Sequence, residues 1–184
     1  MKFQFKIQQY QTDAVNSVVN IFARQPFSDR VSYVRDLGIT KKIQYTQMSM
    51  FNEPGSPDGE VAMGFENARI VLTPEQLLRN IRNIQARNNI KQSDSLVSHL
   101  GACSLDVEME TGTGKTYVYI KTIFELNKRY GWSKFIVVVP SIAIREGVYK
   151  TFQITQDHFM EHYGKKARFF VYNSQNLTEL DNFS

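Results

Sequence analysis

The apolar positions of the first 27 residues follow a helical repeat. They recur at spacings of three and four between Ile7 and Arg24, which predicts a helix with a polar opposite face. Pro26 ends this pattern, because proline lacks the N–H that a helix interior needs. The apolar positions are Ile7, Tyr10, Ala14, Val15, Val18, Val19, Ile21 and Phe22.

The pattern of residues 28–100 predicts an insert between the first helix and the core, made of a hairpin and a second helix. Residues 28–40 have a mixed pattern and receive no assignment. Residues 42–51 and 61–65 alternate loosely around a stretch rich in turn-forming residues, which predicts a β-hairpin. The run Thr73-Pro74-Glu75-Gln76 has the composition of a helix start with a capping box. Apolar positions then predict a helix to about Asn88: Leu77, Leu78, Ile81 and Ile84.

From residue 101 onward, strand patterns alternate with helical ones. Strands are predicted at Leu105–Met109, Phe135–Val139 and Phe169–Tyr172, and helices at Lys115–Tyr130 and over most of Ile142–Tyr163. The continuous β-rich run at 135–139 is typical of a strand buried on both faces. This alternation predicts an α/β fold with a parallel sheet flanked by helices.

Composition supports a globular chain and excludes some classes. Of the 184 residues, 42% are apolar and 22% are charged, as in an ordinary soluble domain. No apolar stretch approaches the length of a membrane span, and the first residues are too polar for a secretory signal, so we expect a cytoplasmic protein with no membrane partner. The lone Cys103 cannot form an internal disulfide and is expected to be a small buried residue. The net charge of +4 permits a polyanionic partner but is weak evidence for one.

Residues 109–116 carry the clearest chemistry. They read Met-Glu-Thr-Gly-Thr-Gly-Lys-Thr between a predicted strand and a predicted helix, which is the context of a phosphate loop. Backbone amides at a helix start can converge on a triphosphate if bulky side chains stay away, and glycine meets that need. The expected ATP-binding residues are Gln11, Glu110, Thr111, Gly112, Thr113, Gly114, Lys115 and Thr116.

Two side chains of this loop have distinct expected roles. Lys115 can reach the β and γ phosphates and is the expected catalytic residue, and the Thr116 hydroxyl can ligate the Mg²⁺ of the nucleotide. Met109 departs from the general pattern, which has glycine there. Superfamily 2 helicases usually carry a small residue at this position instead of the glycine. The departure from glycine therefore reduces the number of candidate families. The alternative is a glycine-rich turn without a ligand.

Two further segments resemble superfamily 2 motifs. Tyr10-Gln11 with residues 13–15 resembles the Q motif, in which a glutamine binds the adenine edge; alternatively, Gln11 is a solvated helix residue. Residues 135–148 resemble motif Ia, in which a strand end and a helix start bind a DNA phosphate, with Ser141 and Arg145 as candidates. The alternative there is a plain connection with a surface arginine.

Together, residues 109–119 and 139–148 closely resemble the restriction (Res) subunit of type III restriction-modification enzymes. The resemblance implies a RecA-like motor domain of a superfamily 2 ATPase. It also implies double-stranded DNA and a methyltransferase (Mod) subunit as partners, and cleavage by a separate carboxy-terminal nuclease domain. Alternatives are another superfamily 2 translocase, such as a type I restriction motor or a repair helicase, and a nucleotide-binding module that does not hydrolyse.

The motor domain is expected to be incomplete in this sequence. No apolar run is followed by the Asp-Glu pair that ATP hydrolysis requires in this class. We therefore expect the natural chain to continue past Ser184, and this part alone to lack hydrolysis and cleavage. Residues 1–184 divide into a Q-motif helix (1–27), an insert (28–100) and a phosphate-loop α/β core (101–184).

Two weaker candidates complete the picture. His158 and His162 are spaced as zinc ligands can be, but the residue next to the first histidine is not the glutamate that zinc peptidases use, and both are expected on the surface. The aromatic residues Phe169, Phe170 and Tyr172 are expected to be core rather than a platform for stacking bases.

Overall fold

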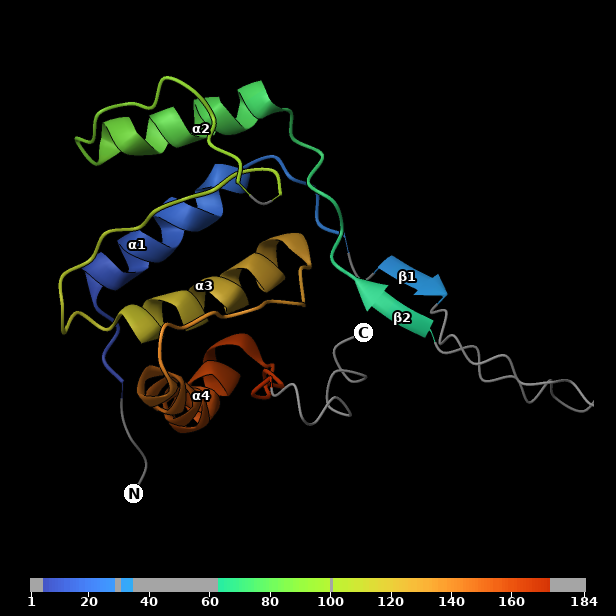
Figure 1. The fold of residues 1–184 in the computed structure, drawn as a ribbon, viewed down its shortest axis with the longest axis vertical. Helices are drawn as coiled ribbons and strands as arrows, with labels where there is room; N and C mark the ends of the chain where they lie inside the picture. Colours follow the sequence, from blue (N-terminus) through green and yellow to red (C-terminus); the bar gives the residue numbers. More distant parts are fainter. Residues whose placement is uncertain (1–4, 29–30, 35–62, 100, 173–184) are drawn as a thin grey trace, which may run out of the picture.

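The computed structural model describes residues 5–28, 31–34, 63–99 and 101–172. Figure 1 shows the helices side by side in the order α2, α1, α3, α4, with a two-stranded ribbon at one side. The elements are α1 (Gln9–Val19), the short 3₁₀ helix η1 (Asn20–Phe22), β1 (Val31–Val34), β2 (Met63–Glu66), α2 (Pro74–Arg87), α3 (Lys115–Tyr130) and α4 (Ile142–Tyr163). None of the helices in the described part is long and apolar enough to cross a membrane.

The helix bounds follow from local capping chemistry. At α2, the Thr73 hydroxyl accepts from the Gln76 N–H at 3.3 Å and the Gln76 side chain accepts from the Thr73 N–H at 2.9 Å. This is the predicted capping box. At the other ends, α3 is followed by the left-handed Gly131 and α4 by the left-handed Gly164, both typical helix terminators. The helices predicted from 73, 115 and 142 are therefore confirmed.

Two apolar clusters hold the helices together. The larger joins α1, η1, α2 and α3, and the smaller lies between α3 and α4. Phe22 and Trp132 meet edge to face in the first cluster, and Phe124 stacks on Phe159 in the second. The larger cluster contains Val15, Val19, Ile21, Phe22, Leu72, Leu77, Val118, Leu126, Tyr130 and Trp132; the smaller contains Ile120, Phe124 and Phe159. Cys103 packs partly buried against the larger cluster, and burial raises the pKa of its thiol.

The ribbon has a partner strand that the sequence pattern does not predict. β1 pairs antiparallel with β2, with Val31 opposite Glu66 and Val34 opposite Met63. The alternating pattern at residues 61–65 thus does correspond to a strand, β2. The strand that pairs with it comes from residues 28–40, for which the sequence pattern predicts no element. The predicted strand at 42–51 and its turn lie outside the described residues.

The predicted parallel sheet is not confirmed. Residues 105–109, 135–139 and 169–172 form no strands, and within the described residues the sheet consists of β1 and β2. A strand exists through hydrogen bonds to a neighbouring strand, and a β-rich composition cannot supply that neighbour. Ile136 and Val138 are 79% and 87% exposed, so the run read as a buried strand is on the surface here.

Candidate phosphate-binding site

The loop at residues 110–114 is built around two left-handed glycines. Gly112 has φ +82° and Gly114 has φ +83°, a backbone region that other residues enter at a cost. The Thr113 hydroxyl donates to the Glu110 carbonyl at 2.7 Å and closes the turn. Thr111 is exposed in the same turn. The backbone geometry thus agrees with the glycine positions that a phosphate loop requires.

The start of α3 differs from the starts of α2 and α4. Thr73 and Ser141 cap those two helices with side-chain oxygens, whereas Gly114 offers no side chain and the first turn of α3 contains no carboxylate. Instead, the helix begins with Lys115, whose charge opposes the helix dipole at a cost of about 0.3 to 1 kcal/mol. The Lys115 side chain is exposed, and its ammonium has no hydrogen bond or ion pair with any described residue. A positive helix end with a free ammonium group suits an anion.

The amino-terminal helix lies against this loop. The Gln11 Nε2 donates to the Thr113 carbonyl at 3.0 Å, and the Tyr10 hydroxyl donates to the same oxygen at 3.2 Å. Gln11 is buried, so it is not the solvated helix residue that was the alternative. A Cβ added to Gly114 would lie 2.7 Å from Gln11 Nε2, closer than real side chains approach. A side chain at position 114 would therefore displace the end of the Gln11 side chain and also strain the backbone.

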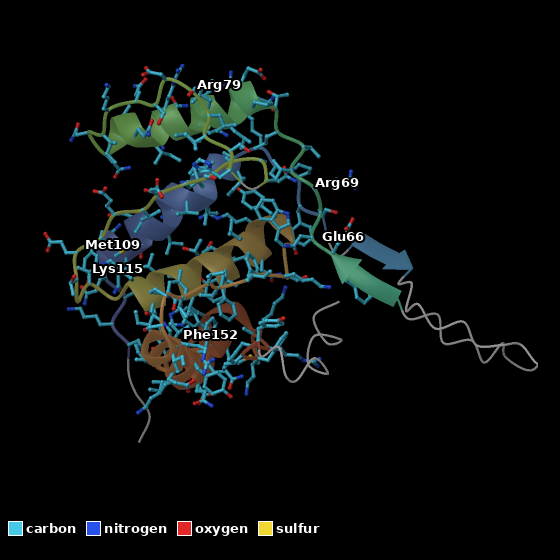
Figure 2. The ribbon with its side chains drawn as sticks, in the orientation of Figure 1. Glu66, Arg69, Arg79, Met109, Lys115 and Phe152 are labelled. Atoms are coloured by element: carbon cyan, nitrogen blue, oxygen red, sulfur yellow. The ribbon has the colours of Figure 1, made fainter. Side chains whose placement is uncertain are left out.

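Met109 occupies the position that departs from the general loop pattern. Its side chain packs, partly buried, against the larger apolar cluster. Figure 2 shows Met109 and Lys115 at the same end of the molecule, beside the start of α1. A methionine therefore connects the loop to the core at its entry, where a glycine could not.

The DNA-contact candidates lie at the start of α4. The Ser141 hydroxyl accepts from the Ile144 N–H at 3.3 Å and caps the helix. The Arg145 guanidinium bonds the neighbouring Glu146 carboxylate at 3.0 Å. Both side chains therefore already have partners, and no contact in the described part of the chain joins either of them to residues 110–116.

His158 is buried, which corrects the expectation that both histidines lie on the surface. Its Nε2 lies 3.0 Å from the Tyr117 hydroxyl, and Phe5 and Phe159 pack against its ring, whereas His162 is exposed. Burial lowers the pKa of His158, the charges of His162 and Lys121 lower it further, and Glu161 opposes them. No group of three potential metal ligands occurs among the described residues. His158 is thus part of the packing between α3 and α4.

The prediction that the aromatic residues at 169–172 are core residues is confirmed in part. Phe169 stacks on Phe152 at 4.8 Å between ring centroids, and both are partly buried. Tyr172 is 63% exposed, so it is not a core residue here.

One buried charge near the site was not predicted from the sequence. Lys121 is 9% exposed, and its Nζ donates to the Thr12 hydroxyl at 3.1 Å. In the linear sequence it is an ordinary lysine within a helix, and the signal that could have drawn attention to it is its place among apolar positions of the predicted helical face.

Comparison with known proteins agrees with the motifs. The family described as type III restriction enzyme, res subunit, matches residues 4–181. A type III restriction-modification enzyme Res subunit from Escherichia coli is 42% identical over 112 residues, and one from Escherichia phage P1 is 39% identical over 113. A third, from Salmonella typhimurium, is 50% identical over 62 residues, which is 34% of this chain and 6% of the relative. The first two alignments cover 59% of this chain and 11% of each relative. Because the family match extends over almost the whole sequence, this chain belongs to the type III restriction enzyme Res subunit family.

Proposed function

We propose that this chain is the ATP-binding part of a type III restriction Res subunit. The complete subunit would be a cytoplasmic, ATP-dependent DNA translocase of the RecA-like superfamily 2 type. With a methyltransferase subunit it would drive cleavage of unmodified double-stranded DNA. The chain spans about a tenth of the length of its relatives, so the whole protein's activity and partners are part of the proposal.

One observation carries the nucleotide-binding assignment: the construction of the start of α3. Left-handed glycines, an uncapped helix end and the free ammonium of Lys115 occur together, and each alone would be unfavourable for folding or neutral. A polyphosphate accounts for all three, because its oxygens accept from the exposed amides and its charge attracts the ammonium. Gly112 leaves open space, since a Cβ there would meet nothing within 4 Å.

Gln11 and Thr116 complete the proposed site. The Gln11 carboxamide offers a donor and an acceptor, which match the adenine edge, and its contact with the Thr113 carbonyl and Gly114 supports a role in the same site. Thr116, in the first turn of α3, would hold Mg²⁺ through its hydroxyl. The bound ion would neutralise charge on the β and γ phosphates.

Ser141 and Arg145 are the proposed contacts to a DNA phosphate. Ser141 marks a second helix start, where backbone amides can donate to an anion. The Arg145–Glu146 pair is exposed, and such pairs contribute about 0 to 1 kcal/mol, so a phosphate could replace Glu146.

Thermal unfolding of the 184-residue chain tests nucleotide binding. Magnesium-ATP at about a hundred times its dissociation constant would stabilise the chain by roughly 2.7 kcal/mol, which raises Tm by several degrees. Lys115→Ala should lose most of this shift, because the ammonium contacts the phosphates. Lys91→Ala removes an exposed lysine outside the loop and should keep it.

A wild-type chain whose Tm is unchanged at millimolar magnesium-ATP would refute the nucleotide site. For the complete subunit with its methyltransferase, we expect DNA-stimulated ATP hydrolysis that Lys115→Ala abolishes. Unchanged turnover in that variant would remove Lys115 from the catalytic role. DNA affinity that is unaltered by Arg145→Ala at several salt concentrations would remove the proposed DNA contact.

A further inference from the structure

Polar contacts run along the packed surface between α1 and α3. Lys121 Nζ donates to the Thr12 hydroxyl at 3.1 Å. Two turns further along α3, the Arg129 guanidinium donates to Asn16 Oδ1 at 3.0 Å and to Asn20 Oδ1 at 2.8 Å. The three acceptors are spaced four residues apart, so they lie on one face of the amino-terminal helical segment. We call these contacts the α1–α3 ladder.

The ladder contacts reflect how α1 is placed along α3. Partner numbers rise together on both helices, so the two helices run in the same direction, as Figure 1 shows. The acceptors recur about once per turn, so a slip of one turn, about 5.4 Å, would break the bond between Lys121 and Thr12 and place a different residue of α1 opposite Lys121. Gln11 precedes Thr12 in the chain, and its Nε2 lies 3.0 Å from the Thr113 carbonyl. Of the contacts in the α1–α3 ladder, the bond between Lys121 and Thr12 is therefore the closest to the loop.

Burial of the Lys121 ammonium is unfavourable for folding. Removing the ammonium from water disfavours the charged form, and burial lowers the pKa of Lys121 while the Glu125 carboxylate raises it. Glu125 also pairs with Arg129 at 3.3 Å and accepts from the Tyr163 hydroxyl at 2.8 Å. A methionine of similar length would pack on α1 without this desolvation cost. In some coiled coils, a single buried polar residue specifies helix register at the expense of stability.

We infer that Lys121 is a positioning residue: through Thr12 it holds Gln11 against the phosphate loop and so determines which base the nucleotide site accepts. This inference rests on the proposed function, because it assigns the adenine contact to Gln11. Lys121 itself contacts neither base nor phosphate in this scheme. Its loss should therefore affect selection of the base while leaving the phosphate contacts of residues 112–116 in place.

The experiment compares three magnesium-bound probes on the 184-residue chain: ATP, GTP and inorganic tripolyphosphate. We expect the wild type to prefer ATP over GTP. Lys121→Met should reduce that preference about tenfold, the effect of one hydrogen bond to a charged group, and leave tripolyphosphate affinity within about twofold. Thr12→Val should have the same effect, and Thr12→Ser should restore the preference because it keeps the hydroxyl. Lys128→Met is the matched control, since Lys128 is an exposed lysine on the same helix.

The outcomes separate this inference from the proposed function. A wild type that binds none of the probes refutes the proposed function. A wild type that binds ATP and GTP equally, or Lys121→Met and Thr12→Val variants that keep the wild-type preference, overturns the role of Lys121. Equal losses of ATP and tripolyphosphate affinity also overturn it, because they indicate a general structural defect. If Lys121→Met does not fold, Thr12→Val and Thr12→Ser decide the question.

Discussion

Gly114→Ala is the most informative single substitution in the loop. The new methyl group would face two penalties that can be separated. The residue has φ +83°, where a Cβ costs about 1 to 2 kcal/mol. The Cβ would also lie 2.7 Å from Gln11 Nε2 and displace that side chain from the Thr113 carbonyl. Loss of this hydrogen bond adds about 0.5 to 1.5 kcal/mol.

Gly112→Ala provides the matched control. Its φ of +82° gives the same backbone penalty, but a Cβ there would meet no atom within 4 Å. We therefore expect the free energy of unfolding to fall by about 1 to 2 kcal/mol for Gly112→Ala and by roughly 1.5 to 3.5 kcal/mol for Gly114→Ala. The difference between the two variants measures the contact of Gln11 with the loop.

Urea unfolding of the 184-residue chain, followed by circular dichroism, gives both values. A second comparison is made in the Gln11→Ala background, where the side chain that the new methyl group meets is absent. There, Gly114→Ala should cost no more than Gly112→Ala. Equal costs of the two alanines in the wild-type background would refute the argument that Gln11 packs on Gly114.

Two further predictions follow from the helix starts and from His158. Thr73→Ala should lower the free energy of unfolding by about 1 kcal/mol through loss of the α2 cap, and Thr73→Ser should restore it; an unchanged urea midpoint in the alanine variant would contradict this. Because the pKa of His158 is lowered from its ordinary value of 6.5, the unfolded chain binds the proton more readily than the folded chain. Stability should therefore fall as pH drops below about 6.5, and Tm measured from pH 7.5 to 5.5 should fall less in His158→Gln. Parallel Tm profiles for the two proteins would exclude His158 as the cause.

The part of the candidate site that consists of consecutive residues could be predicted from the sequence. Residues 110–116 occur together in the chain, and their glycines have the left-handed conformations that the spacing implies. Gln11 was identified through its motif, but its bond to the Thr113 carbonyl joins residues 102 positions apart. Lys121 was missed, because its burial and its bond to Thr12 depend on how α1 lies on α3. The burial of His158 was missed for the same reason, since its partners Tyr117 and Phe5 come from other parts of the chain.

The sequence by itself determined the helices of this protein and the left-handed glycines of the loop before α3. A helix satisfies its backbone within four residues, so caps such as Thr73 and Gly131 suffice to bound it. Tertiary structure decided the rest. A strand needs a neighbouring strand, and the amino-acid composition does not show which segment that neighbour will be. Residues 135–139 therefore form no strand here, and Met63–Glu66 pairs with a segment for which no strand was predicted. The contacts of α1 with the loop and with α3 likewise arise when distant segments pack together, because a buried polar group must find its hydrogen-bonding partner wherever the fold brings one.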